Sequence, residues 1–341
     1  MKTSLSVCMT LISAGIHVSL AVKSNEENPT VVMSFSRMLN INATIPRVAP
    51  WQVFGQQRQR WKRSTNASMN GAPEESVVVL NPRLRVSVSA HDYPFIVSLR
   101  KRGGQHFCAG SLLSDTHVLT AAHCVVPELT NGKRFRVINA SDYEVGVGLH
   151  NRNGGNWRNW YAIKSIQPHE EYINPDNFKV LNDIALITLT KSVLAATKAG
   201  RIELPLNRNT NPQPGDRLLT IGWGKTTVLF DDLPEDLQGA RLTVITDTEC
   251  AKRLGKGRTM PTTNICTDND GATTCSGDSG GPLFKVIGTK KFQLVGITSY
   301  GWKKCTQDKK ASVFTRVSQY LPWILAAQAN RSPRAHGRRH Q

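Results

Sequence analysis

Three short fragments that lie far apart in the chain contain side chains that could together catalyse an acyl transfer. His123 lies in the run TAAHC, Asp183 begins the apolar run DIAL, and Ser279 lies inside the glycine-rich run GDSGGP. A serine hydroxyl is a poor nucleophile at neutral pH, but a histidine can accept its proton and a carboxylate can hold that histidine in the required tautomer. We therefore predict that His123, Asp183 and Ser279 are a catalytic base, its orienting acid and a nucleophile.

The glycine two residues before this serine suggests how the reaction would be assisted. Gly277 can adopt backbone conformations that other residues avoid, so we expect it to turn the N–H groups of Gly277 and Ser279 toward one oxygen. Such an oxyanion hole is worth about 3–4 kcal/mol per donor. Each fragment alone has a plainer interpretation, since a histidine after a strand is more often structural and an aspartate at a strand start is usually a cap or turn residue.

Between residues 86 and 329 the pattern predicts β structure with one helix. Short runs rich in β-branched and apolar residues alternate with Gly, Asn, Pro and Asp, which is typical of a β-sandwich or barrel. These runs are FIVSL, HVLTAA, DIALITL, RLLTIGW, ARLTVIT, QLVGITSY and SVFTRV. We expect a helix over residues 318–329, in which Pro322 is tolerated only because it falls in the first turn.

The first 85 residues differ from the rest of the chain. Lys2, a moderately apolar stretch and a small-x-small site ending at Ala21 predict a secretory signal peptide at 1–21, with a disordered cytosolic end as the alternative. Residues 22–85 are polar and lack cysteine, so we interpret them as a disordered leader. The basic cluster at 60–63 is of the kind that processing proteases cut, which favours a propeptide.

The cysteine content agrees with export from the cell. Six cysteines remain once Cys8 is removed with the signal, and an even number predicts disulfides in an oxidising compartment, with fifteen pairings possible. No CxxC pair is present, which argues against a zinc site. Four glycosylation sequons also fit secretion, at Asn42, Asn66, Asn139 and Asn330.

The chain is strongly basic. Lys and Arg outnumber Asp and Glu 43 to 25, which gives a formal net charge of +18. Such a charge can favour nucleic acid or anionic surfaces, but there is no nucleic-acid motif and the basic residues are scattered or lie in the flanks, including a basic tail at 330–341. We predict a solvated basic surface and no nucleic-acid or membrane partner.

From about residue 92 to 327 the chain resembles the trypsin/chymotrypsin-like serine proteases. TAAHC, DIAL and GDSGGP stand in the order His, Asp, Ser, as in that family, and HFCAGSL, GWG, SYG and the Trp323-Ile324 pair also match. The resemblance implies an all-β fold of two antiparallel six-stranded Greek-key β-barrels, divided near 205–215, with a C-terminal helix. It also implies a serine endopeptidase that cleaves proteins or peptides, acts as a monomer without a cofactor, and can meet protein protease inhibitors.

The resemblance further assigns disulfides and a specificity pocket. The implied bridges are Cys108–Cys124, Cys250–Cys266 and Cys275–Cys305. The base of the pocket maps to Thr273, with Gly301 and Ser312 at its walls. Because Thr273 cannot neutralise a substrate cation, we expect a preference for uncharged aromatic or aliphatic residues over Lys and Arg. Residues 149–161, which match a loop that often binds Ca²⁺ in the family, contain no Asp or Glu, so we expect no metal.

The activation segment departs from the family pattern. In such proteases a new N-terminus pairs with the acid before the nucleophile, which here is Asp278. No Ile-Val-Gly-Gly-like start is present, and the candidate first residues are Val86, Leu84, Val77 and Val78. The alternative to an enzyme is therefore a folded but inactive protease-like binding or regulatory protein.

Overall fold

The computed structural model describes residues 10–13, 16–23, 30–37, 85–86, 88–126, 136–154, 157–174, 180–193, 199–226, 233–255, 260–268, 272–301 and 310–329. The chain divides into two compact units, Met1–Arg83 and Leu84–Gln341. Within the described ranges, no helix combines the length and the apolar character that a membrane span requires. Several features predicted from the sequence lie outside them, namely the basic cluster at 60–63, the tail at 330–341, Cys305 and three of the four sequons.

The first unit contains a small antiparallel sheet in the order β1-β2-β3. Its strands are β1 (Thr10–Ser13), β2 (Ile16–Lys23) and β3 (Thr30–Arg37). The third strand lies in the segment whose composition predicts disorder, but its local run TVVMSFSR is rich in residues that favour strands. The division of residues 1–85 into a signal peptide and a leader stays a prediction.

The second unit begins with a closed barrel of six antiparallel strands, in the order β10-β7-β6-β5-β8-β9. These strands are β5 (Ile96–Lys101), β6 (His106–Leu112), β7 (His117–Thr120), β8 (Tyr143–Val147), β9 (Trp160–Pro168) and β10 (Ala185–Leu189). Side chains such as Leu99, Leu119 and Val145 are fully or almost fully buried inside it. The β-branched and apolar runs of the sequence form its walls because their inward side chains fill the barrel.

A second sheet repeats this arrangement in the order β13-β16-β15-β14-β11-β12-β4. Its strands are β4 (Arg85–Val86), β11 (Arg217–Gly222), β12 (Gln238–Thr243), β13 (Asn264–Asp268), β14 (Pro282–Gly288), β15 (Lys291–Gly301) and β16 (Ala311–Arg316). A bridge between Val244 and Thr267 joins the β12 and β13 ends, and β4 is added outside β12. Without β4, the cyclic strand order equals that of the first barrel, which confirms the predicted pair of six-stranded Greek-key barrels.

The helices of the described residues are short. They are the α-helices α1 (Asp247–Leu254) and α2 (Leu321–Gln328) and the 3₁₀ turns η1 (Ala122–Cys124), η3 (Ala140–Asp142), η4 (Trp157–Asn159) and η5 (Val317–Tyr320). The helix expected over 318–329 is thus α-helical only from Leu321. Pro322 occupies the start of α2, where no backbone N–H is needed, and the 3₁₀ turn η5 precedes it.

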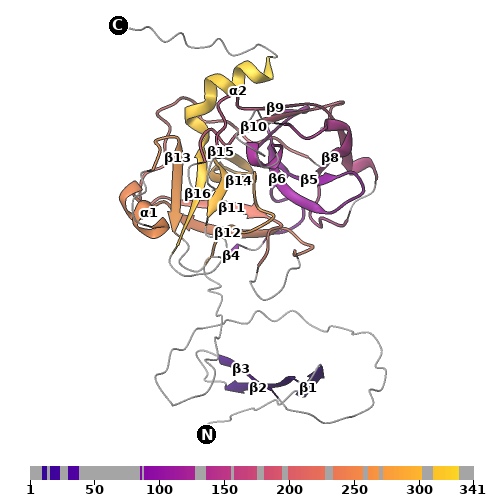
Figure 1. The fold of residues 1–341 in the computed structure, drawn as a ribbon, viewed down its shortest axis with the longest axis vertical. Helices are drawn as coiled ribbons and strands as arrows, with labels where there is room; N and C mark the ends of the chain where they lie inside the picture. The colour runs from indigo at the N-terminus through magenta and orange to yellow at the C-terminus, as the bar shows by residue number, and fades with distance from the viewer. Residues whose placement is uncertain are drawn as a thin grey trace. The chain divides into compact units, whose positions relative to one another are not determined.

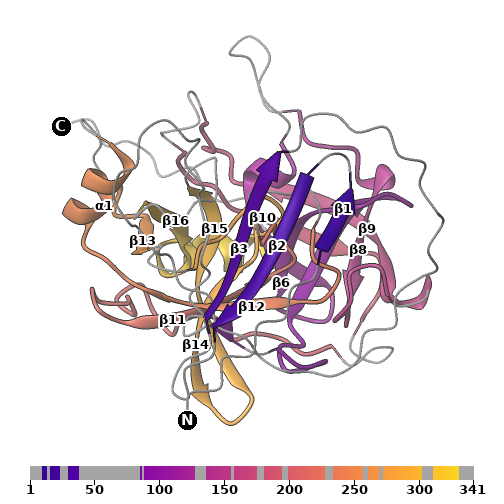
Figure 2. The same cartoon turned by 90° about the horizontal axis from the view of Figure 1, so that it is seen from below.

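The two barrels lie side by side, with the strands of the first and those of the second on opposite sides of both views (Figure 1, Figure 2). An aromatic cluster joins them. Phe95, just before β5, contacts Phe284 of β14 and Phe292 of β15 with ring centroids 5.2 Å apart in each pair. Such pairs add about 0.5–1.5 kcal/mol each beyond the area they bury. These ring contacts fix the position of one barrel relative to the other. The candidate site depends on that position because its residues come from both barrels.

Candidate active site

Strand pairing in the first barrel brings His123 and Asp183 together. In the β7–β10 ladder Thr120 stands opposite Ala185, so the residues just after β7 and just before β10 meet at the same end. His123 Nδ1 lies 2.8 Å from Asp183 Oδ2, and the His123 backbone N–H donates to Asp183 Oδ1 over 2.9 Å. The carboxylate therefore fixes both the position and the tautomer of the imidazole, whose Nδ1 carries the hydrogen.

The second barrel anchors both the side chain and the backbone of the same aspartate. Asp183 is only 1% exposed. Ser299 Oγ in β15 donates to Asp183 Oδ2 over 2.5 Å, and Thr315 Oγ1 in β16 donates to the Asp183 backbone carbonyl over 2.8 Å. A buried carboxylate with this many donors is held in one orientation and kept ionised.

The electrostatics of the pair suit a general base. Burial disfavours the imidazolium form of His123, but the charge and hydrogen bond of Asp183 outweigh it and raise the pKa of His123 above its usual value. Burial likewise opposes the charge of Asp183, but His123, followed by the hydrogen bond from Ser299, holds its pKa below the usual range. An imidazole that takes a proton in this position is therefore stabilised as the cation.

Backbone contacts place Ser279 beside the histidine segment. The Ser279 carbonyl accepts a hydrogen bond from the Ala109 N–H in β6 over 2.8 Å. The next residue, Gly280, has a φ of +77° and packs so closely on Thr120 and Ala109 that a Cβ there would collide with both. Thr120 lies three residues before His123. This packing therefore places Ser279, which belongs to the second barrel, close to the His123 segment of the first barrel.

The side chains of Ser279 and His123 are both described, but no hydrogen bond joins Ser279 Oγ to His123 Nε2. The imidazole Nε2 lies 3.8 Å from the sulfur of Cys124. In unliganded enzymes the contact between nucleophile and base is often long and shortens only when substrate is bound. The structure thus brings the three predicted residues to one place, with His123 and Asp183 in contact and Ser279 adjacent.

The turn before Ser279 has two backbone donors without an acceptor. Gly277 has a φ of +103°, in the region that favours glycine, and the Asp278 N–H closes the turn onto the Cys275 carbonyl over 2.9 Å. Among the described residues, neither the Gly277 N–H nor the Ser279 N–H donates to a protein acceptor. Backbone donors are nearly always paired, so two open ones beside a serine indicate a site for an external oxygen.

Asp278 lies between Gly277 and Ser279 in the sequence. Its buried negative charge is balanced less well than that of Asp183. Its carboxylate accepts hydrogen bonds from the Gly224 and Cys275 N–H groups over 2.8 and 2.9 Å. In the part of the chain that the structure describes, no cationic group forms an ion pair with it. Burial therefore raises the pKa of Asp278 to about 6, although the two hydrogen bonds lower it.

The sequence analysis missed a histidine that supports the turn. His106 Nε2 donates to the Gly277 carbonyl over 2.9 Å, so its Nδ1 accepts from Ser98 Oγ over 2.8 Å. Burial lowers the pKa of His106 to about 4. The hydrogen bond to Gly277 opposes this shift, and the charge of Arg152 adds a smaller lowering. The neutral His106 imidazole thus forms two hydrogen bonds, and the one to the Gly277 carbonyl fixes the peptide that follows Gly277. Ser299 and Thr315 were also missed, and nothing local in their strands signals a partner in the other barrel.

The three residues predicted to form the specificity pocket are neighbours. Thr273 Oγ1 lies 3.2 Å from Ser312 Oγ, and Thr274 Oγ1 donates to the same Ser312 oxygen over 3.2 Å. Gly301 faces Ser312 across the β15–β16 ladder. The hydroxyls at this place form hydrogen bonds with one another, and Ser312 is fully buried.

Two of the implied disulfides are present, Cys108–Cys124 and Cys250–Cys266. Cys275 is also disulfide-bonded, while Cys305 lies outside the described residues. Cys108, His123 and Cys124 place potential metal ligands close together. Since the two sulfur atoms are bonded to each other, they cannot act as thiolate ligands, and the bridge instead ties β6 to the turn that carries His123.

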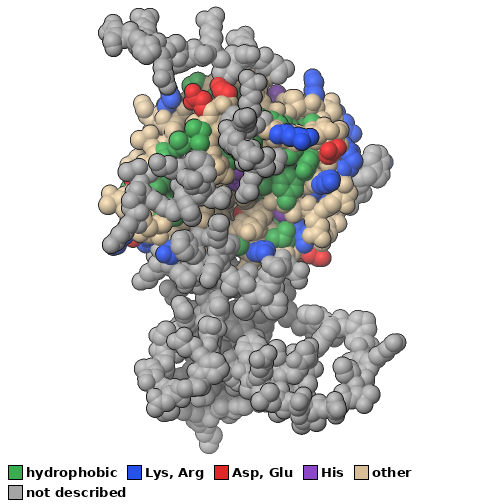
Figure 3. Space-filling model, viewed as in Figure 1, with side chains coloured by type: hydrophobic (Ala, Val, Ile, Leu, Met, Phe, Trp, Pro, Cys, Tyr) green, Lys and Arg blue, Asp and Glu red, His purple; other side chains and the backbone are tan. Residues whose placement is uncertain are grey.

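Basic side chains are dispersed on the visible part of the second unit. In Figure 3 the Lys and Arg side chains occur in several separate places, with acidic groups among them. Locally they form ion pairs, such as Arg100 with Glu144 at 2.8 Å and Arg253 with Glu249 at 2.8 Å. The solvated basic surface expected from the sequence stays a prediction.

Comparison with known proteins gives the same picture. The sequence model of the trypsin family matches residues 85–324. The chain is 33% identical to chymotrypsin-C of Bos taurus, over 76% of this chain and 93% of that protein. It is 32% identical to chymotrypsin-like elastase family member 1 of Bos taurus, over 72% and 88%, and 35% identical to serine protease 1 of Drosophila melanogaster, over 68% and 79%. The chain therefore belongs to the trypsin family and is a chymotrypsin-like serine endopeptidase.

Proposed function

We propose that this serine protease uses Ser279, His123 and Asp183 as its catalytic residues. Ser279 Oγ attacks the peptide carbonyl carbon while His123 Nε2 takes its proton, and the resulting oxyanion accepts hydrogen bonds from the N–H groups of Gly277 and Ser279. His123 then donates the proton to the leaving amine, and water hydrolyses the acyl-enzyme by the same steps. The observation that carries the proposal is the pair of open N–H donors next to the fixed His123–Asp183 pair.

Labelling with a fluorophosphonate tests this function. The reagent forms a covalent bond with an activated serine, so mass spectrometry of the mature protein should find the label on the peptide that contains Ser279. Labelling should decline as the pH falls through the pKa of His123, since the protonated imidazole cannot act as a base. A mature protein that is not labelled at all would leave the inactive binding protein as the better interpretation. That second candidate rests on the absence of a Ser279–His123 hydrogen bond and of a cationic partner for Asp278 among the described residues.

We further propose that the protein is secreted as a zymogen. Removal of a signal at 1–21 and cleavage of a leader at 22–85 would expose a new N-terminal ammonium group, which would pair with Asp278. The site holds that carboxylate without a cationic partner among the described residues of the uncut chain, as expected before activation. Of the candidate first residues only Val86 is described, and it pairs with Gly239 at the edge of β12. N-terminal sequencing of the mature protein identifies the cut.

The raised pKa of Asp278 predicts how stability depends on pH in the uncut form. A folded pKa of about 6, against the ordinary value of 3.8, means that the folded state binds more protons between these values. Asp278 therefore lowers the free energy of unfolding as pH rises from about 4 to 6, by roughly 2–3 kcal/mol in total. Relative to Asp278→Asn, the uncut wild type should lose this amount between pH 4 and pH 7 in urea denaturation, with Ser279→Ala in both chains to prevent self-cleavage. A difference that stays constant over this range would contradict the interpretation.

The proposed specificity is for uncharged residues before the cleaved bond. Thr273 and Ser312 offer hydroxyls that already bond to each other, and neither provides a negative charge. A substrate Lys or Arg would lose its hydration there without gaining an ionic partner. Gly301 leaves space at the wall, so an aromatic or medium aliphatic side chain can enter.

Thr273→Asp should shift this preference toward Lys and Arg. The carboxylate would supply the missing partner for a cation, so we expect the ratio of kcat/KM for Arg over Phe peptides to rise by at least about tenfold. The measurement uses peptides that differ only in the residue before the cleaved bond. Thr273→Val is the control, because it removes the hydroxyl without adding a charge and should leave the preference for uncharged residues intact. A wild type that already prefers Arg would show that the pocket is assigned wrongly.

A further inference from the structure

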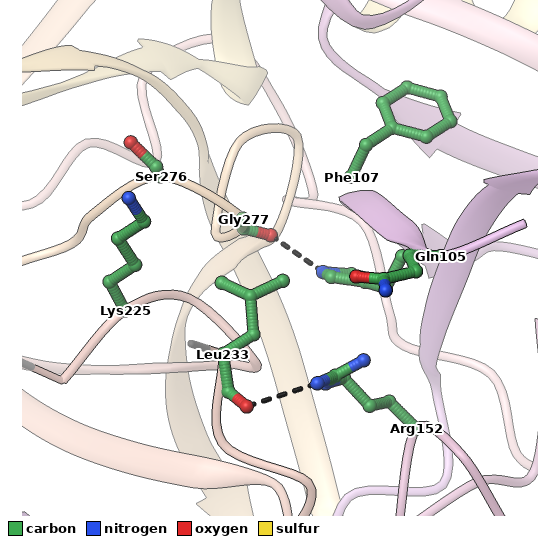
Figure 4. Close-up of a pocket in the computed structure, with 8 residues that line it drawn as sticks. Gln105, Phe107, Arg152, Lys225, Leu233, Ser276 and Gly277 are labelled. Carbon is green, nitrogen blue, oxygen red and sulfur yellow. Dashed lines mark hydrogen bonds between the residues drawn. The ribbon is translucent and has the colours of Figure 1, made fainter. Parts of the chain in front are cut away.

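A second pocket borders the turn that carries the open N–H donors. It has a volume of about 340 Å³ and is lined in part by Gly277, Ser276, Gln105, Phe107, Arg152 and Lys225 (Figure 4). None of the residues assigned to the specificity pocket lines it. A substrate whose carbonyl oxygen meets the Gly277 N–H therefore has a further binding site within reach, distinct from the one near Thr273.

The charged residues that line this pocket are both cations. Among the residues that the structure describes, Arg152 and Lys225 line it and no Asp or Glu does. The Arg152 guanidinium donates to the Pro234 and Leu233 carbonyls over 3.0 Å each and to Asn153 Oδ1 over 3.0 Å. All three acceptors are uncharged, so these bonds orient the guanidinium without neutralising it. Figure 4 shows Arg152 and Lys225 extending from different segments of the chain, with Leu233 between them.

Two acidic side chains of the described chain that follow the Arg152 acceptors in sequence are engaged elsewhere. Glu235 and Asp236 follow the carbonyls that hold Arg152, but their carboxylates accept hydrogen bonds from the side-chain amides of Asn151 and Asn153 over 3.0–3.3 Å. Among the described residues no carboxylate lies within ion-pair distance of Arg152. The positive charge of Arg152 also reaches the base of the turn, where it contributes to the lowered pKa of His106.

We propose that this pocket binds an acidic side chain of the substrate in the first three residues after the cleaved bond. The inference rests on the proposed function, which sets the direction of the substrate. With its carbonyl at Gly277 and Ser279 and its preceding side chain near Thr273, a peptide leaves the site past Ser276 and Gly277, where the second pocket begins. A carboxylate there can accept charge-assisted hydrogen bonds from the guanidinium of Arg152 and the ammonium of Lys225.

Matched peptides test the proposal. The mature protein is given internally quenched peptides with the same residues before the cleaved bond and Asp, Asn or Lys at each of the next three positions. For at least one position we expect kcat/KM to be about 5- to 20-fold higher for Asp than for Asn, and lowest for Lys. The preference for Asp should decrease as salt rises from about 0.05 to 0.5 M, because the interaction is ionic. Equal rates for Asp and Asn at all three positions would overturn the proposal.

Variants of the two cations locate the effect. Arg152→Gln and Lys225→Gln should each reduce the preference for Asp, whereas Arg152→Lys, which keeps the charge, should retain most of it. Lys252→Gln is the control for charge, since Lys252 lies on α1 with its side chain 81% exposed and does not line the pocket. A preference for Asp that survives in Arg152→Gln and Lys225→Gln, or that is lost equally in Arg152→Lys and Lys252→Gln, would show that this pocket is not its cause.

A binding measurement separates this inference from the proposed function. In Ser279→Ala the same Asp and Asn peptides can be compared by fluorescence anisotropy, which needs no hydrolysis. Tighter binding of the Asp peptide supports the acidic subsite even if the mature protein proves unreactive toward fluorophosphonate, in which case only the proposed catalysis fails. Equal binding of the two peptides together with normal labelling of Ser279 would overturn the subsite and leave the protease function intact.

Discussion

Ser279→Ala is expected to lower kcat for peptide hydrolysis by about 10⁶-fold, while the protein should still fold and bind peptides. The methyl group cannot attack the carbonyl, so the acyl-enzyme does not form, and only the oxyanion donors and binding energy remain to assist water. Because Ser279 Oγ makes no hydrogen bond to another described residue, its removal should change the free energy of unfolding by less than about 0.5 kcal/mol. The measurement is kcat with active-site-titrated enzyme, together with urea denaturation.

The matched control is Ser165→Ala. Ser165 lies on β9, is exposed and pairs with Thr188 across the ladder, so its hydroxyl has no contact with the site. This variant should keep full activity and full fluorophosphonate labelling. If Ser279→Ala kept more than about one hundredth of the wild-type rate, the nucleophile would have to be another residue.

Asp183→Asn is the second large effect, with an expected loss in kcat of about 10⁴-fold. The asparagine amide can replace the shape of the carboxylate but not its charge, and it can hold His123 in the wrong tautomer, with the hydrogen on Nε2. Such an imidazole cannot accept the proton of Ser279. The variant should still fold, since the packing volume is unchanged, although Ser299 and the His123 backbone lose a charged acceptor.

The pH profile distinguishes this role from a purely structural one. In the wild type Asp183 raises the pKa of His123, so the acidic limb of kcat/KM should have its midpoint above about 6.5. In Asp183→Asn burial alone remains, and it lowers the pKa of an imidazole, so the midpoint should move to lower pH. Ser299→Ala is the comparison, because it removes one donor to Asp183 but keeps the charge and should leave the midpoint above about 6.5. An unchanged midpoint in Asp183→Asn would contradict the assignment of the acid.

The strands were predictable because their signal is local, whereas their arrangement in two barrels was implied only by the resemblance to the trypsin/chymotrypsin-like proteases. Each strand needs only alternating or continuous apolar residues bounded by turn residues, and runs such as FIVSL and DIALITL contain that pattern in full. The predicted helix exists, but its expected start lies three residues before α2 begins, because η5 occupies Val317–Tyr320. Helix ends depend on how the first turn meets its neighbours, which no local pattern specifies.

The side chains His123, Asp183 and Ser279 could be named from the sequence alone, because each stands in a motif whose residue types are dictated by the reaction. Their arrangement was decided only by the tertiary structure, since the β7–β10 register and the packing of Gly280 on Thr120 join segments that are far apart along the chain. The support of the turn by His106, the compensation of Asp183 by Ser299 and the cationic pocket at Arg152 and Lys225 belong to the same class. Each arises where side chains from separate elements meet, and sequence spacing carries no information about such meetings.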